Sequence, residues 1–219
     1  MTPCLYPQPN LFSAAAYRGL RVGLFGGSFN PAHAAHRQVA EYALETLDLD
    51  VVWWLVSPQN PLKSSEDMMP LGQRIASAHA QITWPRMLVT AIETHWGTQY
   101  TADTIRQLKK HFPYTKFTWM MGADSLRTFH HWEDWRDIAR SVPIAVFARP
   151  PQQIRALSGF AAKTLQRCRW KNHVGQQFSK GNWRYVMMPL NPISATEIRT
   201  QHAARKNKNL DHCCEESGQ

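Results

Sequence analysis

Cysteine is scarce in this chain of 219 residues, and its four cysteines form no metal or redox motif. Cys4 and Cys168 are isolated while Cys213 and Cys214 are adjacent, so neither a CxxC pair nor zinc-ligand spacing occurs. Long apolar runs are also missing, which excludes a membrane-spanning helix. The first twenty residues lack a basic segment followed by an apolar stretch, which argues against a secretory signal. We therefore expect a cytoplasmic protein with reduced thiols.

Acidic residues are absent from one long segment, residues 138–196. This segment contains nine of the 25 Lys and Arg residues, and the other 16 equal the 16 Asp and Glu elsewhere. The whole net charge of +9 therefore lies in one part of the chain. Such a segment can be a solvated basic face, or it can attract a polyphosphate or a nucleic acid. No RNA- or DNA-binding motif accompanies it, so a nucleic-acid-binding protein stays an alternative only.

The apolar pattern predicts a single α/β domain. Short apolar runs typical of buried strands alternate with segments of helical apolar spacing. The expected strands cover 22–25, 50–56, 87–92, 116–121, 143–148 and 183–188, and the expected helices cover 31–44, 71–81, 101–111, 123–129, 132–140, 152–167 and 194–202. This order predicts a Rossmann-like, doubly wound, mostly parallel sheet with helices on both faces. We assign 20–205 to this domain, 1–19 to an irregular leader and 206–219 to a polar tail.

A glycine turn follows the first expected strand, and residues 26–36 read GGSFNPAHAAH. Gly26 and Gly27 allow the backbone to approach a ligand closely. Asn30 suits a helix N-cap and Pro31 the first helical position. The free N–H groups at such a helix start favour an anion, for example a phosphate.

His33 and His36 are three residues apart, so they share one face of the first helical turns. Beside a phosphate site, two imidazoles indicate phosphoryl or nucleotidyl transfer, although an isolated pair is more often a surface pair. A zinc site is disfavoured because zinc-protease helices space two histidines i, i+4 around a glutamate. Here alanines intervene and no third ligand is near in the sequence.

Two further segments have a helix-start interpretation beside a functional one. Ser194 and Glu197 form an S-x-x-E capping box, which by itself predicts only a helix N-terminus. Asp124 follows the expected strand 116–121, where a carboxylate can cap the next helix or contact a ligand. Thr101 has the same two interpretations at the start of the helix 101–111.

Several motifs together resemble the nucleotidyltransferases related to nicotinate-nucleotide adenylyltransferase. Segment 26–36 is similar to their GG(S/T)F(D/N)PxHxxH signature, with Asn30 where the family often has Asp, and 193–199 is similar to ISxTxxR. Segments 121–125, 99–104 and 58–63 resemble (I/M)GxDS, (S/R)YTxxT and, with a different proline register, P-x-(N/Q)-x-P-x-(H/K). The resemblance covers about residues 20–200 and weakens through 150–183, and 207–219 lacks the apolar helix that many members have.

The resemblance implies roles for individual residues. The catalytic residues it implies are His33, His36 and Arg199. The ATP-binding residues it implies are Gly26, Gly27, Ser28, Phe29, Lys63, Asp124, Ser194 and Thr196. The mononucleotide-binding residues it implies are Asn60, Tyr100, Thr101 and Trp132. Trp132 would stack on the nicotinate ring, whereas we expect Trp135 to be a core residue.

The activity that this resemblance implies is transfer of AMP from ATP to nicotinate mononucleotide, a step of NAD biosynthesis that yields deamido-NAD and pyrophosphate. The mononucleotide phosphate would attack the α-phosphorus in line, without a covalent intermediate. Mg²⁺ would be held mainly by the ATP phosphates, not by a protein metal site. Alternative acceptors are nicotinamide mononucleotide and pantetheine phosphate. A nucleotide sensor that has lost its activity is a further alternative.

Overall fold

Six parallel strands form one sheet in the order β3-β2-β1-β4-β5-β6. The computed structural model describes residues 11–58, 68–148, 156–169 and 180–188. The strands are β1 (Arg21–Gly27), β2 (Val51–Val56), β3 (Met87–Thr90), β4 (Lys116–Gly122), β5 (Ile144–Ala148) and β6 (Trp183–Met187). The chain builds outward from β1 in one direction and from β4 in the other, so the strand order reverses between these two strands. The predicted Rossmann-like fold is confirmed.

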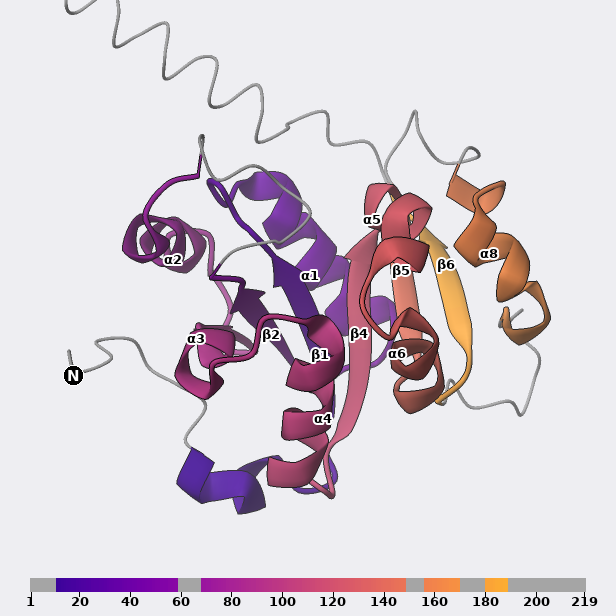
Figure 1. Ribbon diagram of the computed structural model, residues 1–219. Coiled ribbons are helices and arrows are strands. Elements are labelled where there is room, and N and C mark those ends of the chain that lie inside the picture. The colour runs from indigo at the N-terminus through magenta and orange to yellow at the C-terminus, as the bar shows by residue number, and fades with distance from the viewer. Residues whose placement is uncertain (1–10, 59–67, 149–155, 170–179, 189–219) are drawn as a thin grey trace, which may run out of the picture.

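Helices cover both faces of this sheet (Figure 1). They are α1 (Ala34–Thr46), α2 (Leu71–His79), α3 (Ile92–Trp96), α4 (Thr101–His111), α5 (Ala123–Thr128), α6 (Trp135–Ser141) and α8 (Phe160–Thr164), with 3-10 helices η1 (Leu11–Tyr17), η2 (Phe129–His131) and η3 (Gln166–Cys168). Helices α1 and α2 share one apolar cluster with the sheet, and α3, α4, α5, α6 and α8 share the other. None of the helices in the described ranges is long and apolar enough to cross a membrane.

The strands supply both apolar clusters because successive side chains of a strand point to opposite faces. Trp53 and Trp119 belong to the cluster under α4 and α6, whereas their neighbours Trp54 and Met120 belong to the cluster under α1 and α2. All four side chains are at most 2% exposed. This burial on both faces explains why the strands are nearly continuous apolar runs.

The segment before β1 packs against the domain. Residues that the sequence assigned to an irregular leader include η1, and the ring of Tyr17 at its end lies edge-on to Trp53 at 4.9 Å and to Phe112 at 5.7 Å. The Thr115 hydroxyl donates to the Tyr17 carbonyl oxygen at 2.9 Å.

Several predicted elements differ from the structure. The helix predicted over 132–140 begins only at Trp135, and the helix predicted over 152–167 is broken within its described part, where the short helix α8 is followed by η3. Strand β3 ends at Thr90, the last residue paired with β2, and the chain then enters the short helix α3, which was not expected. Helix α1 begins at Ala34 with His33 as its N-cap, so Asn30 is not the N-cap and Pro31 is not the first helical residue. The Asn30 carboxamide is used elsewhere, because its Oδ1 accepts the Met69 N–H at 2.9 Å.

One predicted helix, 194–202, lies outside the described residues. Five predicted site residues also lie outside them, namely Asn60, Lys63, Ser194, Thr196 and Arg199.

Candidate functional site

A cavity of about 390 Å³ opens at the carboxyl ends of β1, β2 and β4. This is the point where the strand order reverses, which is where doubly wound sheets bind their ligands. Its volume suits a small-molecule site. The residues that line it are Gly26, Gly27, Ser28, Ser57, Glu93, Gln99, Tyr100, Thr101, Trp119, Asp124, Ser125, His131, Trp132 and Glu133.

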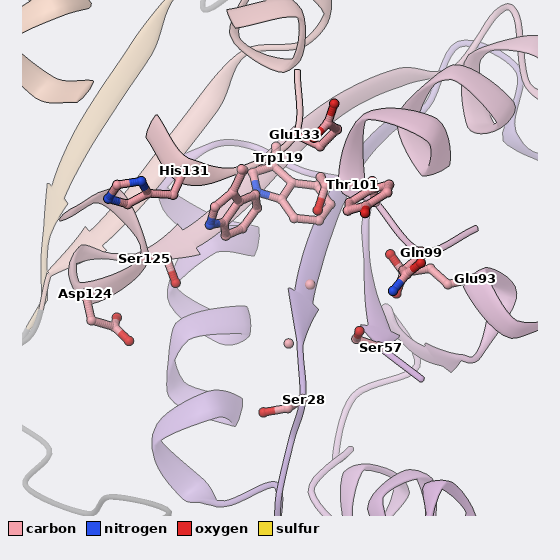
Figure 2. Close-up of a pocket in the computed structure, with 14 residues that line it drawn as sticks. Ser28, Ser57, Glu93, Gln99, Thr101, Trp119, Asp124, Ser125, His131 and Glu133 are labelled. Carbon is pink, nitrogen blue, oxygen red and sulfur yellow. The ribbon is translucent and has the colours of Figure 1, made fainter. Parts of the chain in front are cut away.

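Seven of the predicted site residues meet in this cavity, although they come from four separate segments. They are Gly26, Gly27, Ser28, Tyr100, Thr101, Asp124 and Trp132. In Figure 2, Asp124 lies on one side of Ser28, and Gln99 and Glu93 lie on the other. The cavity therefore has two ends that are joined by the glycine turn.

Neither Asp124 nor Thr101 is the N-cap of a helix, which was the alternative interpretation of both residues. The N-cap of α5 is Gly122, and Asp124 is the second residue of that helix. The N-cap of α4 is Tyr100, and Thr101 is the first helical residue. Both Asp124 and Thr101 instead line the cavity, where they are available to a ligand.

Gly26 lets the indole of Trp119 lie against the turn. A Cβ atom at position 26 would be only 2.5 Å from Cη2 of Trp119, whose side chain is 2% exposed. Any larger residue would push this buried ring, and the ring itself lines the cavity. Glycine is therefore required here by the close approach of the Trp119 ring, whereas the sequence argument had invoked the approach of a ligand.

Trp132 is held by two other aromatic rings. It lies edge-on to Trp119, with centroids 6.2 Å apart, and edge-on to Phe129 at 5.4 Å. These contacts fix a half-buried indole at the wall of the cavity. Trp135, in contrast, is 7% exposed and belongs to the core, as predicted.

His33 and His36 lie together at the start of α1, with ring centroids 3.9 Å apart. The backbone N–H of His33 donates to Nδ1 of His36 at 3.2 Å, which caps the helix. Because Nδ1 accepts this bond, the proton of the neutral His36 ring sits on Nε2 and can be donated to a ligand. Neither ring is among the residues lining the described cavity, and the His33 side chain is only 4% exposed.

The Phe29 ring supports the turn from within. Its side chain is 2% exposed and packs against Trp54 at 5.1 Å and Phe25 at 5.5 Å. The backbone of Phe29 has a φ of 45°, in the left-handed region. Phe29 is not among the residues that line the cavity, although it directly follows Ser28, which is.

Glu93 is a buried carboxyl group in the cavity wall that the sequence argument missed. It is 7% exposed, and burial raises its pKa to about 7, against the opposing effect of a hydrogen bond from Thr104. The Thr104 hydroxyl lies 3.1 Å from Oε1 of Glu93 and 2.9 Å from the Thr98 hydroxyl. This network ties α3 to the turn that presents Tyr100 and Thr101. Glu93 lies just beyond the carboxyl end of β3, and this position in the sequence could have indicated a site residue.

The sequence argument also missed other lining residues, namely Ser57, Gln99, Trp119, Ser125, His131 and Glu133. Ser57 directly follows β2, and Ser125 follows Asp124, so strand ends could have indicated both. Trp119 carries no such signal because it reads as one more apolar strand residue.

Comparison with known proteins identifies the family of this chain. The sequence model of the cytidylyltransferase-like family matches residues 24–201. A probable nicotinate-nucleotide adenylyltransferase of Caulobacter sp. (strain K31) is 47% identical over 183 residues, covering 82% of this chain and 97% of the relative. The chain belongs to the nicotinate-nucleotide adenylyltransferase family. The resemblance drawn from the motifs is thereby confirmed.

Other members of the nicotinate-nucleotide adenylyltransferase family agree in sequence and fold. The probable enzyme of Erythrobacter litoralis (strain HTCC2594) is 49% identical over 185 residues, which is 82% of this chain and 84% of the relative. The Plasmodium falciparum nicotinic acid mononucleotide adenylyltransferase complexed with NaAD has a TM-score of 0.63 at 16% identity, covering 83% of each chain. At that identity the likeness shows the fold.

Proposed function

We propose that this chain transfers AMP from ATP to nicotinate mononucleotide, forming deamido-NAD and pyrophosphate in NAD biosynthesis. The observation that carries the proposal is one cavity that joins a glycine turn, Asp124 and the pair Trp132 and Thr101 at the point of strand reversal. The relatives at 47% and 49% identity are named for this reaction.

The two ends of the cavity suit two nucleotides. ATP would lie with its phosphates along Gly26, Gly27 and Ser28 and with its nucleoside near Asp124. The mononucleotide would occupy the other end, with its pyridine ring against Trp132 and beside Tyr100 and Thr101. Its phosphate would then face the α-phosphate of ATP over the glycine turn.

The chemistry needs alignment more than proton transfer. An oxygen of the mononucleotide 5′-phosphate attacks the α-phosphorus of ATP, and the bond from that phosphorus to the bridging α,β oxygen breaks. The electron pair of this bond leaves with pyrophosphate. The attacking phosphate is already an anion, so the protein has only to hold the reactants in line and stabilise the developing charge.

The histidines would supply hydrogen-bond donors to that charge. Nε2–H of His36, fixed as a donor by the helix cap, and the ring of His33 beside it would bind α- and β-phosphate oxygens. Arg199, Ser194, Thr196 and Lys63 are proposed to hold the departing pyrophosphate, and Asn60 to line the mononucleotide pocket. These assignments follow from the family motifs.

A divalent cation would accompany the nucleotide. Within the described residues no three His, Cys, Asp or Glu side chains form a group that could hold a metal. We propose that this cation is Mg²⁺, which would be held mainly by the ATP phosphates. Bound there, the cation would neutralise negative charge on the triphosphate.

The proposed function is tested by measuring pyrophosphate release from ATP and Mg²⁺ with each acceptor in turn. We expect nicotinate mononucleotide to give the highest kcat/KM, above nicotinamide mononucleotide and pantetheine phosphate. Release that is fastest with pantetheine phosphate, or that requires none of the three acceptors, would refute the assignment.

Replacing Trp132 by alanine should weaken binding of the mononucleotide specifically. Loss of one ring-stacking surface costs about 1–3 kcal/mol, so the KM for the mononucleotide should rise about 5- to 150-fold, while the KM for ATP changes little. Steady-state kinetics with each substrate varied checks this. Trp84, which is 38% exposed and does not line the cavity, gives the matched control Trp84→Ala. Equal effects of both substitutions on the mononucleotide KM would contradict the stacking role.

A further inference from the structure

Arg74 is a buried arginine that ties together the loops at the carboxyl ends of β1 and β2. Its side chain extends from α2 and is 1% exposed. Nη1 donates to the carbonyl oxygens of Ser28 at 2.8 Å and Ser57 at 2.7 Å. Nη2 donates to that of Pro58 at 2.8 Å, and Nε to that of Met69 at 2.9 Å. One guanidinium group thus joins three chain segments around the site.

A guanidinium group at this depth is costly unless its charge is compensated. Across the described ranges no Asp or Glu forms a salt bridge with Arg74. Burial lowers its pKa, but an arginine stays protonated in proteins. The charge is therefore stabilised by carbonyl dipoles through four charge-assisted hydrogen bonds. Only a planar fork with several donors can make all of these bonds.

The bond to the Ser28 carbonyl fixes the orientation of the next peptide N–H. The C=O and N–H groups of a trans peptide point in opposite directions, and the only cis peptide among the described residues is Asn30–Pro31. Because the Ser28 carbonyl points at Arg74, the N–H of Phe29 points away from Arg74. No backbone acceptor within the described ranges takes this N–H. Ser28 and Ser57, whose carbonyl groups Arg74 holds, both line the cavity.

We propose that Arg74 is a positioning residue for adenylyl transfer, which sets the peptide planes of the glycine turn so that the Phe29 N–H donates to a phosphate of ATP. The inference rests on the proposed function. The guanidinium group itself does not touch substrate, because it is buried and its bonds go to carbonyl oxygens. Its positive charge, which no Asp or Glu of the described ranges neutralises, also favours the anionic triphosphate.

The substitution Arg74→Lys tests this role because lysine keeps the positive charge but lacks the planar guanidinium group that bonds to all four carbonyl oxygens. Misplacement of reacting groups by about 1 Å costs about 100-fold in rate, so kcat per folded molecule should fall on that order. The loss should fall mainly on kcat, and the KM for the mononucleotide should change less, since at that end of the cavity Arg74 holds only backbone carbonyl oxygens of the Ser57 loop. Tryptophan fluorescence during urea unfolding gives the folded fraction of each variant, and kcat is divided by this fraction.

Arg86→Lys is the matched control. Arg86 also donates to backbone carbonyl oxygens, those of Asp50 and Leu49, but it lies at the opposite end of β2 from the cavity. Its kcat should match that of the unaltered protein. A folded Arg74→Lys variant with unchanged kcat would overturn the inference, as would equal losses in both variants. An unaltered protein without activity toward ATP and nicotinate mononucleotide would instead refute the proposed function.

A measurement on the unaltered protein covers the case in which Arg74→Lys does not fold. Amide hydrogen exchange of Phe29 should slow when a non-reacting ATP analogue and Mg²⁺ bind, because the N–H gains a phosphate acceptor. The Gly19 amide, which donates to the Tyr114 carbonyl oxygen at 2.9 Å near the opposite end of β1, should not change. An unchanged exchange rate at Phe29 with the analogue bound would overturn the inference.

Discussion

Replacing His33 by alanine is expected to lower kcat about 100-fold, because positioned donors to a developing charge contribute on that order. The substitution removes the His33 side chain from the capping box of α1, but the bond from the His33 backbone N–H to Nδ1 of His36 stays in place. The side chain is 4% exposed, which leaves a small cavity after truncation. Stopped-flow or steady-state measurement of pyrophosphate release gives kcat, and thermal unfolding confirms that the variant is folded.

His95→Ala is the control for this substitution. His95 lies in the last turn of α3, is exposed and does not line the cavity. Its kcat should be unchanged. A folded His33→Ala variant that keeps a kcat within about threefold of the unaltered protein would show that His33 is not a donor in the transition state.

Replacing Glu93 by glutamine is expected to remove a pH-dependent loss of stability. Burial raises the pKa of Glu93 to about 7 from an ordinary 4.5, so the folded state favours the protonated carboxyl group. Its contribution to stability is complete below pH 4.5 and is lost as the pH rises toward 7. The shift corresponds to roughly 3 kcal/mol in the free energy of unfolding. Glutamine stays neutral and keeps an oxygen that can accept the Thr104 hydroxyl.

Urea unfolding between pH 5 and pH 8 measures this effect. The Glu93→Gln variant should gain stability relative to the unaltered protein as the pH rises, by up to about 3 kcal/mol at pH 8. Glu133→Gln, the same substitution at an exposed position, is the control. If the difference between Glu93→Gln and the unaltered protein were constant with pH, Glu93 would titrate normally.

The sheet could be predicted from the sequence because parallel strands buried on both faces are short apolar runs. The helix start at α1 could not, since the Asn30 carboxamide binds the Met69 N–H 39 residues away and does not cap the helix. The pattern that favoured an N-cap at Asn30 is local, and the bond that decided the outcome is long-range. Strand β3 was predicted two residues too long because Ala91 and Ile92 are as apolar as the strand itself.

The site residues that lie within sequence motifs were predicted. Those that belong to the site only because the fold buries them beside it were missed. Gly26, Asp124 and Trp132 were found from their segments and lie in one cavity. Arg74 and Glu93 were not, because a charged residue outside any recognised motif is taken for a surface residue until its neighbours in the fold are known. Both are at most 7% exposed, and both hold loops that form the cavity wall.

The stereochemical course at the α-phosphorus tests the central claim most directly. The protein would be given ATP with a chiral phosphorothioate at the α position, Mg²⁺ and nicotinate mononucleotide, and the dinucleotide product would be isolated and its configuration determined. Direct in-line attack over the glycine turn predicts a dinucleotide with inverted configuration at phosphorus. Retention, which requires a covalent intermediate, or the absence of any dinucleotide would contradict the account.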